Sequence, residues 1–193
     1  RVGRFGLLAI SRKDGRLFAQ MPGASAFRIY PRSRTEWFAD NPDGFFPNTS
    51  TQISFHAGEV VVRKNSADIV APRMSDAQAD KIARDLAARI AAKAPLPNSE
   101  KILRGYIAGM QSGTPDYDAM SPGAAWITRL ILLNFAQDTA DLGALRAVTF
   151  QGVAPTGADN YAVTFEHGSA VAQIICAPDG KIEMVYLMSP TFM

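Results

Sequence analysis

The sequence predicts an α+β protein in which an antiparallel β-meander or small open barrel is followed by helices packed on a curved antiparallel sheet. Three observations predict this class. Residues 1–73 contain six or seven short strand patterns separated by tight turns. Residues 75–142 contain three helix patterns, and four further strand patterns follow them. A run of hairpin-linked strands after helices favours a sheet that is covered by helices on one face.

The composition is that of a globular chain with little net charge. Of its 193 residues, 47% are hydrophobic and 20% are charged, which is enough apolar material for a sizeable core. The formal net charge of +2 is too small for strong attraction to nucleic acid, so we expect no nucleic-acid partner. No apolar run approaches the roughly 18 residues that a membrane-spanning helix needs, so we expect no membrane span.

Alternation of side chains predicts strands throughout the first 73 residues. Leu17, Ala19 and Met21 alternate with Phe18 and Gln20, which is the period of a half-buried strand. Glycine, proline and asparagine separate such runs from one another. The expected strands cover residues 5–11, 16–21, 27–30, 36–39, 52–56, 59–64 and 67–71, with turns at 13–15, 22–23, 41–44, 57–58 and 65–66.

The pattern changes from strand to helix at Ser75. Ser75 and Gln78 have the spacing of a capping box at a helix N-terminus. Ile82, Leu86 and Ile90 recur every four residues and therefore share one side of an alanine-rich helix over residues 75–93. The proline-rich segment 94–97 ends that helix, and we expect residues 74–98 to form a helical linker between two domains.

Two more helices are predicted before the C-terminal strands. Ser99 is the expected N-cap of the second helix, which glycine and proline stop at residues 113–115. Ser121 and Pro122 are typical of the start of a third helix, which ends near residue 142. The apolar side of the second helix contains Ile102, Leu103, Tyr106, Ile107 and Met110, and one side of the third contains Trp126, Leu130 and Leu133.

Four strand patterns complete the chain and define the second domain. They cover residues 147–153, 161–167, 170–177 and 181–188, and a Pro-Asp-Gly turn at 178–180 joins the last two. We therefore expect residues 1–73 to form an antiparallel β module and residues 99–193 to form a separate α+β domain.

The first domain carries motifs of a known accessory module. They are Val-Gly-Arg-Phe at 2–5, Gly-Arg-Leu-Phe-Ala-Gln at 15–20, Pro-Gly at 22–23, Phe-Arg-Ile-Tyr-Pro-Arg-Ser at 27–33, Trp-Phe at 37–38, Gln-Ile-Ser-Phe at 52–55 and Ala-Pro-Arg at 71–73. On these motifs, residues 1–73 resemble the small lipocalin-like β-domain that follows the catalytic domain in many bacterial β-lactamase-like, penicillin-binding-protein-related serine hydrolases. Residues 60–66 depart from the Val–hydrophobic–His–Gln–Asn–Gly hairpin that family members usually carry.

This resemblance implies a role, a partner and a location. The accessory β-domain of those hydrolases is not an enzyme, which implies a non-catalytic role. The partner that the resemblance implies is a serine hydrolase catalytic domain in the same parent chain. Proteins of that class are exported, which implies a periplasmic or exported location.

The second domain is similar to nuclear-transport-factor-2-like (cystatin-like) cones. The similarity rests on the order of the helices, on Tyr-Asp-Ala-Met-Ser-Pro at 117–122, and on the strand at 159–165. This fold is used by enzymes, ligand binders and interaction modules, so it does not fix a function. Aromatic side chains with polar tips often line such a cone, and the candidate pocket residues are Tyr106, Tyr117, Trp126, Tyr161 and Tyr186.

The sequence lacks the signatures of serine-hydrolase chemistry. No lysine follows a serine at the Ser-x-x-Lys spacing, and no Gly-x-Ser-x-Gly elbow occurs. His56 and His167 lie in different domains, which does not suit a metal site. Cys176 is the only cysteine and lies in an apolar strand, so we expect a buried, unreactive thiol. We therefore expect no catalytic residue, no metal and no cofactor.

Three functions are open on the sequence alone. The leading hypothesis is a non-catalytic accessory region of an exported serine hydrolase, which packs against the catalytic domain, covers part of its cleft or self-associates as a homo-oligomer. The second is a small-ligand-binding protein with a pocket between the helix of Trp126 and the strand of Tyr161. The third is a cone-fold enzyme that uses acid/base catalysis. On the predicted strand 161–167, the face of Tyr161, Val163 and Phe165 carries no carboxylate in apolar surroundings, so this hypothesis has no support from a tuned acid.

Overall fold

The computed structural model describes residues 7–20, 25–39, 51–64, 67–177 and 179–188, and it confirms the predicted α+β class. The chain divides into two compact units, residues 1–87 and 88–193. The boundary falls within helix α1 (Asp76–Ala91), inside the segment predicted as a linker. Each unit has its own antiparallel sheet and its own apolar core. Within the described ranges, no helix is both long enough and apolar enough to cross a membrane.

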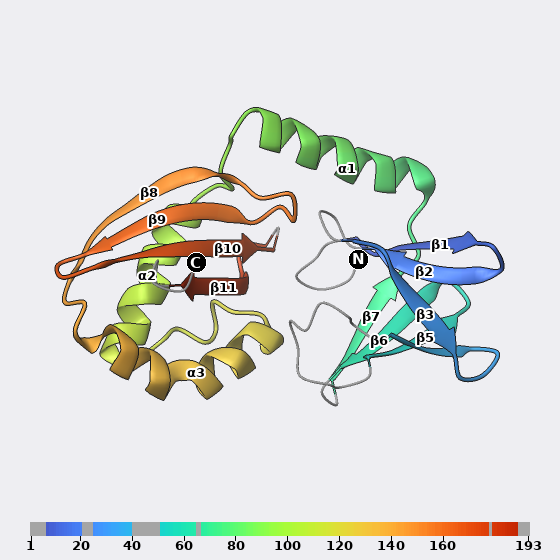
Figure 1. The fold of residues 1–193 in the computed structure, drawn as a ribbon, viewed down its shortest axis with the longest axis horizontal. Coiled ribbons are helices and arrows are strands. Elements are labelled where there is room, and N and C mark those ends of the chain that lie inside the picture. Colours follow the sequence, from blue (N-terminus) through green and yellow to red (C-terminus); the bar gives the residue numbers. More distant parts are fainter. Residues whose placement is uncertain (1–6, 21–24, 40–50, 65–66, 178, 189–193) are drawn as a thin grey trace. The chain divides into compact units, whose positions relative to one another are not determined.

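The first unit is a curled meander of seven short antiparallel strands (Figure 1). The order of the strands in the sheet follows the chain from first to last, which confirms the predicted meander. The strands are β1 (Ala9–Lys13), β2 (Arg16–Gln20), β3 (Phe27–Pro31), β4 (Glu36–Ala39), β5 (Thr51–His56), β6 (Glu59–Lys64) and β7 (Ala67–Pro72).

The first hairpin turns at the two residues that tolerate its geometry best. Lys13 pairs with Arg16, so Asp14 and Gly15 alone form the turn. Their φ angles of 51° and 74° are those of a type I′ turn. The strand predicted at 5–11 is shifted: residues 7 and 8 lie outside it, and β1 continues two residues past the predicted end. Arg12 and Lys13 belong to this edge strand, and a hydrophobic pattern does not identify such charged positions. The motif at 2–5, Met21 and the turns predicted at 22–23, 41–44 and 65–66 lie outside the described residues.

One face of the curled sheet carries its apolar core. Buried side chains alternate with more exposed ones along the strands, which is the pattern that the sequence predicts. Leu8 precedes β1 and packs against this cluster, and it also packs against the cluster of Val62 and Ala71. The residue just before β1 therefore shares core contacts with β6 and β7. The buried members of the main cluster are Ala19, Ile29, Ala39 and Ile53.

Helix α1 begins with the predicted capping box. The backbone N–H of Gln78 donates to the Ser75 hydroxyl at 3.3 Å, and the backbone N–H of Ser75 donates to Oε1 of Gln78 at 3.0 Å. The predicted apolar stripe of Ile82, Leu86 and Ile90 is half-buried, and no side chain of the helix is fully buried.

The second unit is a four-stranded antiparallel sheet with two helices against one face (Figure 1). The strand order is β11-β10-β9-β8, and the strand boundaries differ from the predicted ones by at most two residues. This arrangement confirms the predicted sheet with helices on one face. The elements are α2 (Ser99–Ser112), α3 (Pro122–Ala140), β8 (Leu145–Val153), β9 (Asp159–Phe165), β10 (Ser169–Cys176) and β11 (Ile182–Met188).

The core of the second unit lies between these helices and the inner face of the sheet. The predicted apolar side of α2 is confirmed, because four of its five members are buried and the fifth, Ile102, packs against them. Alternate residues of β9 point to the same core. The main buried members from α2 and β9 are Leu103, Tyr106, Ile107, Met110, Tyr161, Val163 and Phe165.

Ser99 does not cap α2, so that prediction is wrong. Asn98 occupies the N-cap position in a left-handed conformation, and its side chain makes no capping hydrogen bond. Ser99 lies in the first turn of the helix and is buried, with its hydroxyl 2.6 Å from the hydroxyl of Tyr161. A partner on the sheet, and not the end of its own helix, therefore orients this side chain.

Candidate functional site

Two of the five predicted pocket residues lie inside the core of the second unit. Tyr106 and Tyr161 are buried, and each phenol contacts another hydroxyl. The Tyr106 oxygen lies 3.4 Å from that of Thr128, and the Tyr161 oxygen lies 2.6 Å from that of Ser99. The ring of Tyr161 also packs edge-on against Phe150, with ring centroids 5.5 Å apart. Both polar tips are therefore engaged by the protein itself.

The other three predicted pocket residues lie elsewhere. Tyr117 is half-buried beneath an arginine of α3, and Trp126 is exposed on that helix. Tyr186 pairs with Gln173 across the β10–β11 ladder. Gln173 alternates with core residues along β10, so Tyr186 lies on the face of the sheet opposite to Tyr161. The structure therefore brings Tyr106 and Tyr161 into one core and directs Trp126 and Tyr186 away from it.

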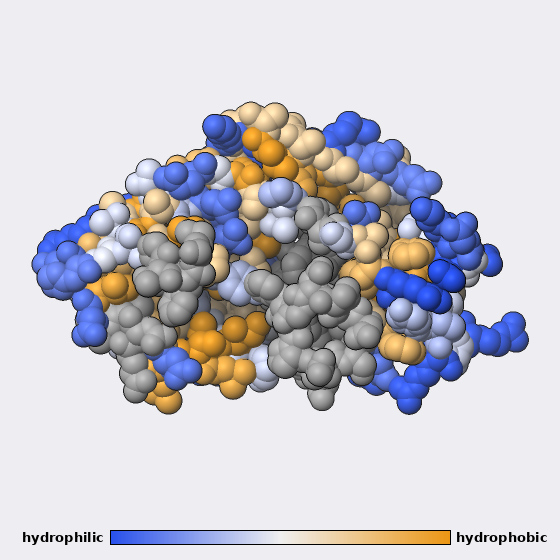
Figure 2. Space-filling model, in the orientation of Figure 1, coloured by the Kyte–Doolittle hydropathy of each residue, from blue (hydrophilic) through white to orange (hydrophobic). Residues whose placement is uncertain are grey.

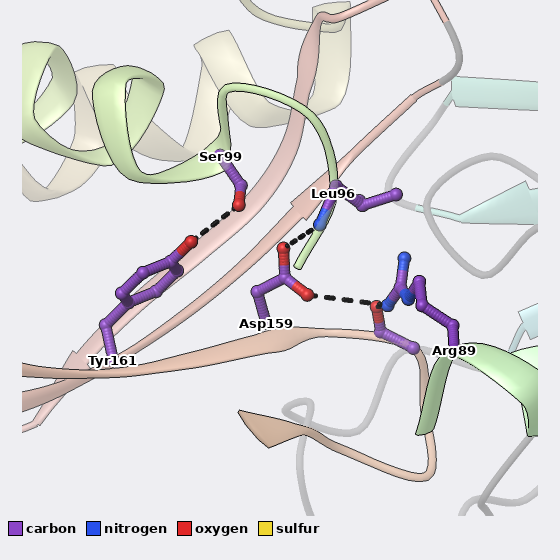
Figure 3. A network of polar contacts seen from close by, with 6 residues as sticks. Arg89, Leu96, Ser99, Asp159 and Tyr161 are labelled. Atoms are coloured by element: carbon purple, nitrogen blue, oxygen red, sulfur yellow. Dashed lines mark hydrogen bonds and ion pairs between the residues drawn. The ribbon is translucent and has the colours of Figure 1, made fainter. Parts of the chain in front are cut away.

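A buried carboxylate at the start of β9 organises a polar network (Figure 3). Asp159 is fully buried, and its Oδ2 accepts a hydrogen bond from the backbone N–H of Leu96 at 2.8 Å. Its Oδ1 lies 3.6 Å from Nη2 of Arg89, in the last turn of α1. The same Nη2 donates to the carbonyl of Gly157. The network thus connects the end of α1 and the proline-rich segment to strand β9.

The charges of Asp159 and Arg89 compensate each other away from water. A lone carboxylate is costly to bury, and here one backbone N–H and one guanidinium offset that cost. Among the residues that the structure describes, Oδ1 of Asp159 and Nε of Arg89 have no hydrogen-bond partner. The contact is therefore an ion pair without a direct hydrogen bond, and its role is to hold two segments of the chain together.

Burial raises the pKa of three groups of the second unit. It raises the pKa of Cys176 from 9.0 to about 11, with additional contributions from the negative charges of Asp159 and Glu183. Burial likewise raises the pKa of Tyr106 and that of Tyr161 above the ordinary value of 10.0. All three groups are therefore protonated near neutral pH, and none has the lowered pKa of an activated nucleophile.

The two histidines are exposed and belong to different units. His56 ends β5, and His167 lies in the connection between β9 and β10. Glu166, next to His167, forms an exposed ion pair with Arg146 at 2.6 Å. In the part of the chain that the structure describes, no three histidine, cysteine, aspartate or glutamate side chains lie close enough together to hold a metal ion.

The start of α3 is fastened to the sheet of the second unit. Met120 forms a parallel bridge with Ile182 of β11, and the backbone N–H of Ser121 donates to the Ile182 carbonyl at 2.8 Å. The Ser121 hydroxyl accepts a hydrogen bond from the N–H of Ala124 at 3.3 Å, and Pro122 is the first residue of the helix, as predicted. These contacts fix which side of α3 faces the core.

Helix α3 is apolar on its inner and its outer side. Its inner side buries Ala124, Ala125 and Thr128. Its outer side carries five large apolar side chains that are exposed, and Figure 2 shows hydrophobic surface over this helix. The exposed fractions are 50% for Trp126, 37% for Ile127, 60% for Leu130, 36% for Ile131 and 78% for Leu133. These five residues are called the α3 face, and they include the apolar side predicted for this helix.

Two features of the site were not predicted from the sequence. Arg89 and Asp159 lie far apart in the chain, so no local pattern pairs them. The outward direction of the α3 face was also missed, although a signal was present. Residues 127–135 contain more apolar positions than one core-facing side of a helix requires.

Comparison of the chain with protein-family models, with curated proteins and with solved structures finds no match.

Proposed function

We propose that this chain is a non-catalytic interaction region that accompanies an exported bacterial serine hydrolase of the β-lactamase-like class. The α3 face is the observation that carries the proposal. Monomeric proteins rarely expose contiguous apolar patches larger than a few hundred Å², and such patches mark interaction sites. The resemblance of residues 1–73 to the accessory β-domain of those hydrolases supports the choice of class.

The physical character of α3 supports this role. Large apolar side chains normally line the side of a helix that protein encloses, and the core of the second unit encloses only one side of α3, so five such side chains stay exposed. Covering the other side would remove Trp126, Leu130 and Leu133 from water, at a gain of about 25 cal/mol for each Å² buried. Tryptophan is also among the residues that contribute most to protein interfaces.

A small-ligand-binding cone is less well supported. That alternative needs polar side-chain tips that face a ligand, and the hydroxyls of Tyr106 and Tyr161 instead contact Thr128 and Ser99. Burial raises the pKa of both phenols above the ordinary value, which makes an ionised oxygen less accessible still. The core positions of these two residues favour a structural role for them.

Cysteine labelling of the complete gene product tests the interaction role. In a Cys176→Ala background, Leu130→Cys places a thiol in the centre of the α3 face, and Lys101→Cys places a control thiol on the exposed side of α2. If another protein surface covers the α3 face, the thiol at 130 should react with a maleimide at least about tenfold more slowly than the control thiol. Tenfold protection corresponds to a free energy of about 1.4 kcal/mol between the covered and the open state. Equal rates would count against the interaction role.

The non-catalytic part of the proposal has a separate test. The purified 193-residue chain should hydrolyse p-nitrophenyl acetate and a chromogenic cephalosporin no faster than the same chain after heat denaturation. Hydrolysis that a single substitution abolishes would overturn this part of the proposal.

A further inference from the structure

We propose that the α3 face binds the same face of a second copy of this chain, with a two-fold axis beside Leu130. The inference rests on the interaction role proposed above and names the partner of that surface. A two-fold pair uses the same patch on both copies, so the patch must complement itself. The spacing, charge and area of the α3 face all meet this requirement.

The spacing of the large side chains suits antiparallel pairing. Trp126, Leu130 and Leu133 lie at i, i+4 and i+7, along one line of the helix surface. With the axis beside Leu130, Trp126 of one copy packs against Leu133 of the second copy, and the two Leu130 side chains meet. A large indole thus faces a smaller side chain on each side of the axis. Ile127 and Ile131 widen the stripe to an arc of roughly 160°, at 3.6 residues per turn.

The α3 face carries no charge that would oppose self-association. Arg129 is the only charged residue among residues 122–135. Its guanidinium carbon lies 4.1 Å from the centroid of the Tyr117 ring, so this charge is engaged by an aromatic side chain. None of the five side chains of the α3 face is charged, and the exposed Arg129 lies over Tyr117 at the edge of the stripe. A strongly acidic or basic partner would find no complementary charge on the α3 face, which favours a second copy as the occupant.

The exposed area is that of the apolar centre of a stable dimer interface. With full side-chain areas of roughly 180–250 Å², the exposed fractions of the five residues correspond to about 500 Å² of apolar surface per copy. Stable interfaces bury about 800 Å² per partner, with an apolar centre and a polar rim. The α3 face therefore has the size of the apolar centre of one such interface.

The mass of the 193-residue chain in solution tests this pairing. Light scattering over about 1–100 μM should show a mass that rises with concentration toward twice 20.8 kDa. Leu130→Glu places two carboxylates against each other at the axis and should return the mass to 20.8 kDa, with the circular dichroism spectrum unchanged. Thr149→Glu is the control, because Thr149 is exposed on β8, and it should leave the dimer intact.

Disulfide cross-linking tests the register and does not depend on the folding of Leu130→Glu. In a Cys176→Ala background, Leu130→Cys should form a covalent dimer on oxidation. A mixture of Trp126→Cys and Leu133→Cys chains should form a mixed dimer, because these positions face each other across the axis. Lys101→Cys, on the exposed side of α2, should form none.

The outcomes separate this inference from the interaction role. If the chain is monomeric at every concentration but the thiol at position 130 of the complete gene product reacts slowly with maleimide, the pairing with a second copy is wrong and the interaction role still holds. If the chain is monomeric and this thiol reacts as fast as the control thiol, both the pairing and the interaction role are wrong. A dimer that Leu130→Glu leaves intact, with no disulfide between Leu130→Cys chains, also overturns pairing through the α3 face.

Discussion

The Nη2 atom of Arg89 lies 3.6 Å from the Oδ1 atom of Asp159, whose side chain is fully buried. Asp159 is the only charged side chain that is buried among the residues the structure describes. Its partners come from the last turn of α1 and from Leu96 in the proline-rich segment. The last turn of α1, the proline-rich segment and β9, all within the second unit, therefore meet at one compensated charge.

Removal of Arg89 should destabilise the second unit. Arg89→Met keeps a long apolar side chain but leaves the carboxylate of Asp159 with only the N–H of Leu96. Breaking a buried ion pair from one side typically costs about 3–5 kcal/mol, and this pair lacks a direct hydrogen bond, so we expect a loss of roughly 3 kcal/mol. Urea unfolding followed by circular dichroism measures the change in the free energy of unfolding.

Two further variants show whether the charge is the cause. Arg146→Met breaks an exposed pair with Glu166 and should change the free energy of unfolding by less than about 0.5 kcal/mol. Asp159→Asn removes the charge but keeps an oxygen that accepts the N–H of Leu96, so Arg89→Met should cost less in that background. An equal cost of Arg89→Met in both backgrounds would contradict the assignment.

The hydroxyl pair of Ser99 and Tyr161 should be strongly coupled. Tyr161→Phe leaves the Ser99 hydroxyl buried without this partner, and Ser99→Ala does the same to the phenol, so each change should cost about 1–3 kcal/mol. Because the double variant leaves neither group unpaired, it should cost less than the two single changes together. Ser112→Ala, which removes an exposed hydroxyl at the end of the same helix, is the control. Additive costs, measured by thermal and urea unfolding, would show that the two hydroxyls act separately.

Elements defined by neighbouring residues were the most predictable part of the fold. The Asp14–Gly15 turn, the box formed by Ser75 and Gln78, and the helix start at Pro122 each depend on contacts within about four residues. Hydrophobic periodicity then predicted the strands and the buried side of α2, because one face of each must leave water.

Contacts between distant residues could not be predicted in this way. Ser99 has the local features of an N-cap, but its partner Tyr161 lies on another element. The sequence predicts that this element is a strand and does not predict that it lies beside Ser99. A one-residue change of register reverses the face of every side chain in a strand, so the side of the sheet on which Tyr186 lies was open. The direction of Trp126 depended on how the start of α3 is attached to β11.

The stability of the second unit should fall at high pH, with Cys176 responsible for the first part of the loss. Its pKa is about 11 in the folded chain against an ordinary value of 9.0, so the unfolded chain loses this proton first. The stabilisation is fully present below pH 9 and is lost as the pH rises to 11, by about 2 kcal/mol. Cys176→Ala should remove this part of the pH dependence in urea unfolding at pH 8 and pH 11. An unchanged slope between these pH values would assign the loss to Tyr106 and Tyr161, whose raised pKa values act in the same direction at higher pH.

Two glycines of α2 should respond in opposite directions to replacement by alanine. A Cβ atom on Gly109 would lie 2.9 Å from Cα of Pro115 and 3.3 Å from the carbonyl oxygen of Thr114, both of which belong to the backbone that ends the helix. Since that backbone must shift, Gly109→Ala should destabilise the unit by about 1–3 kcal/mol.

Gly105 is the matched control in the same helix, because a Cβ there meets no atom within 4 Å. Gly105→Ala gains helix propensity without a clash and should stabilise the unit by roughly 0.5–1 kcal/mol. Thermal unfolding of the two variants beside the unmodified chain measures both effects. If Gly109→Ala were as stable as Gly105→Ala, the close approach of Pro115 to α2 would not be a constraint on the fold.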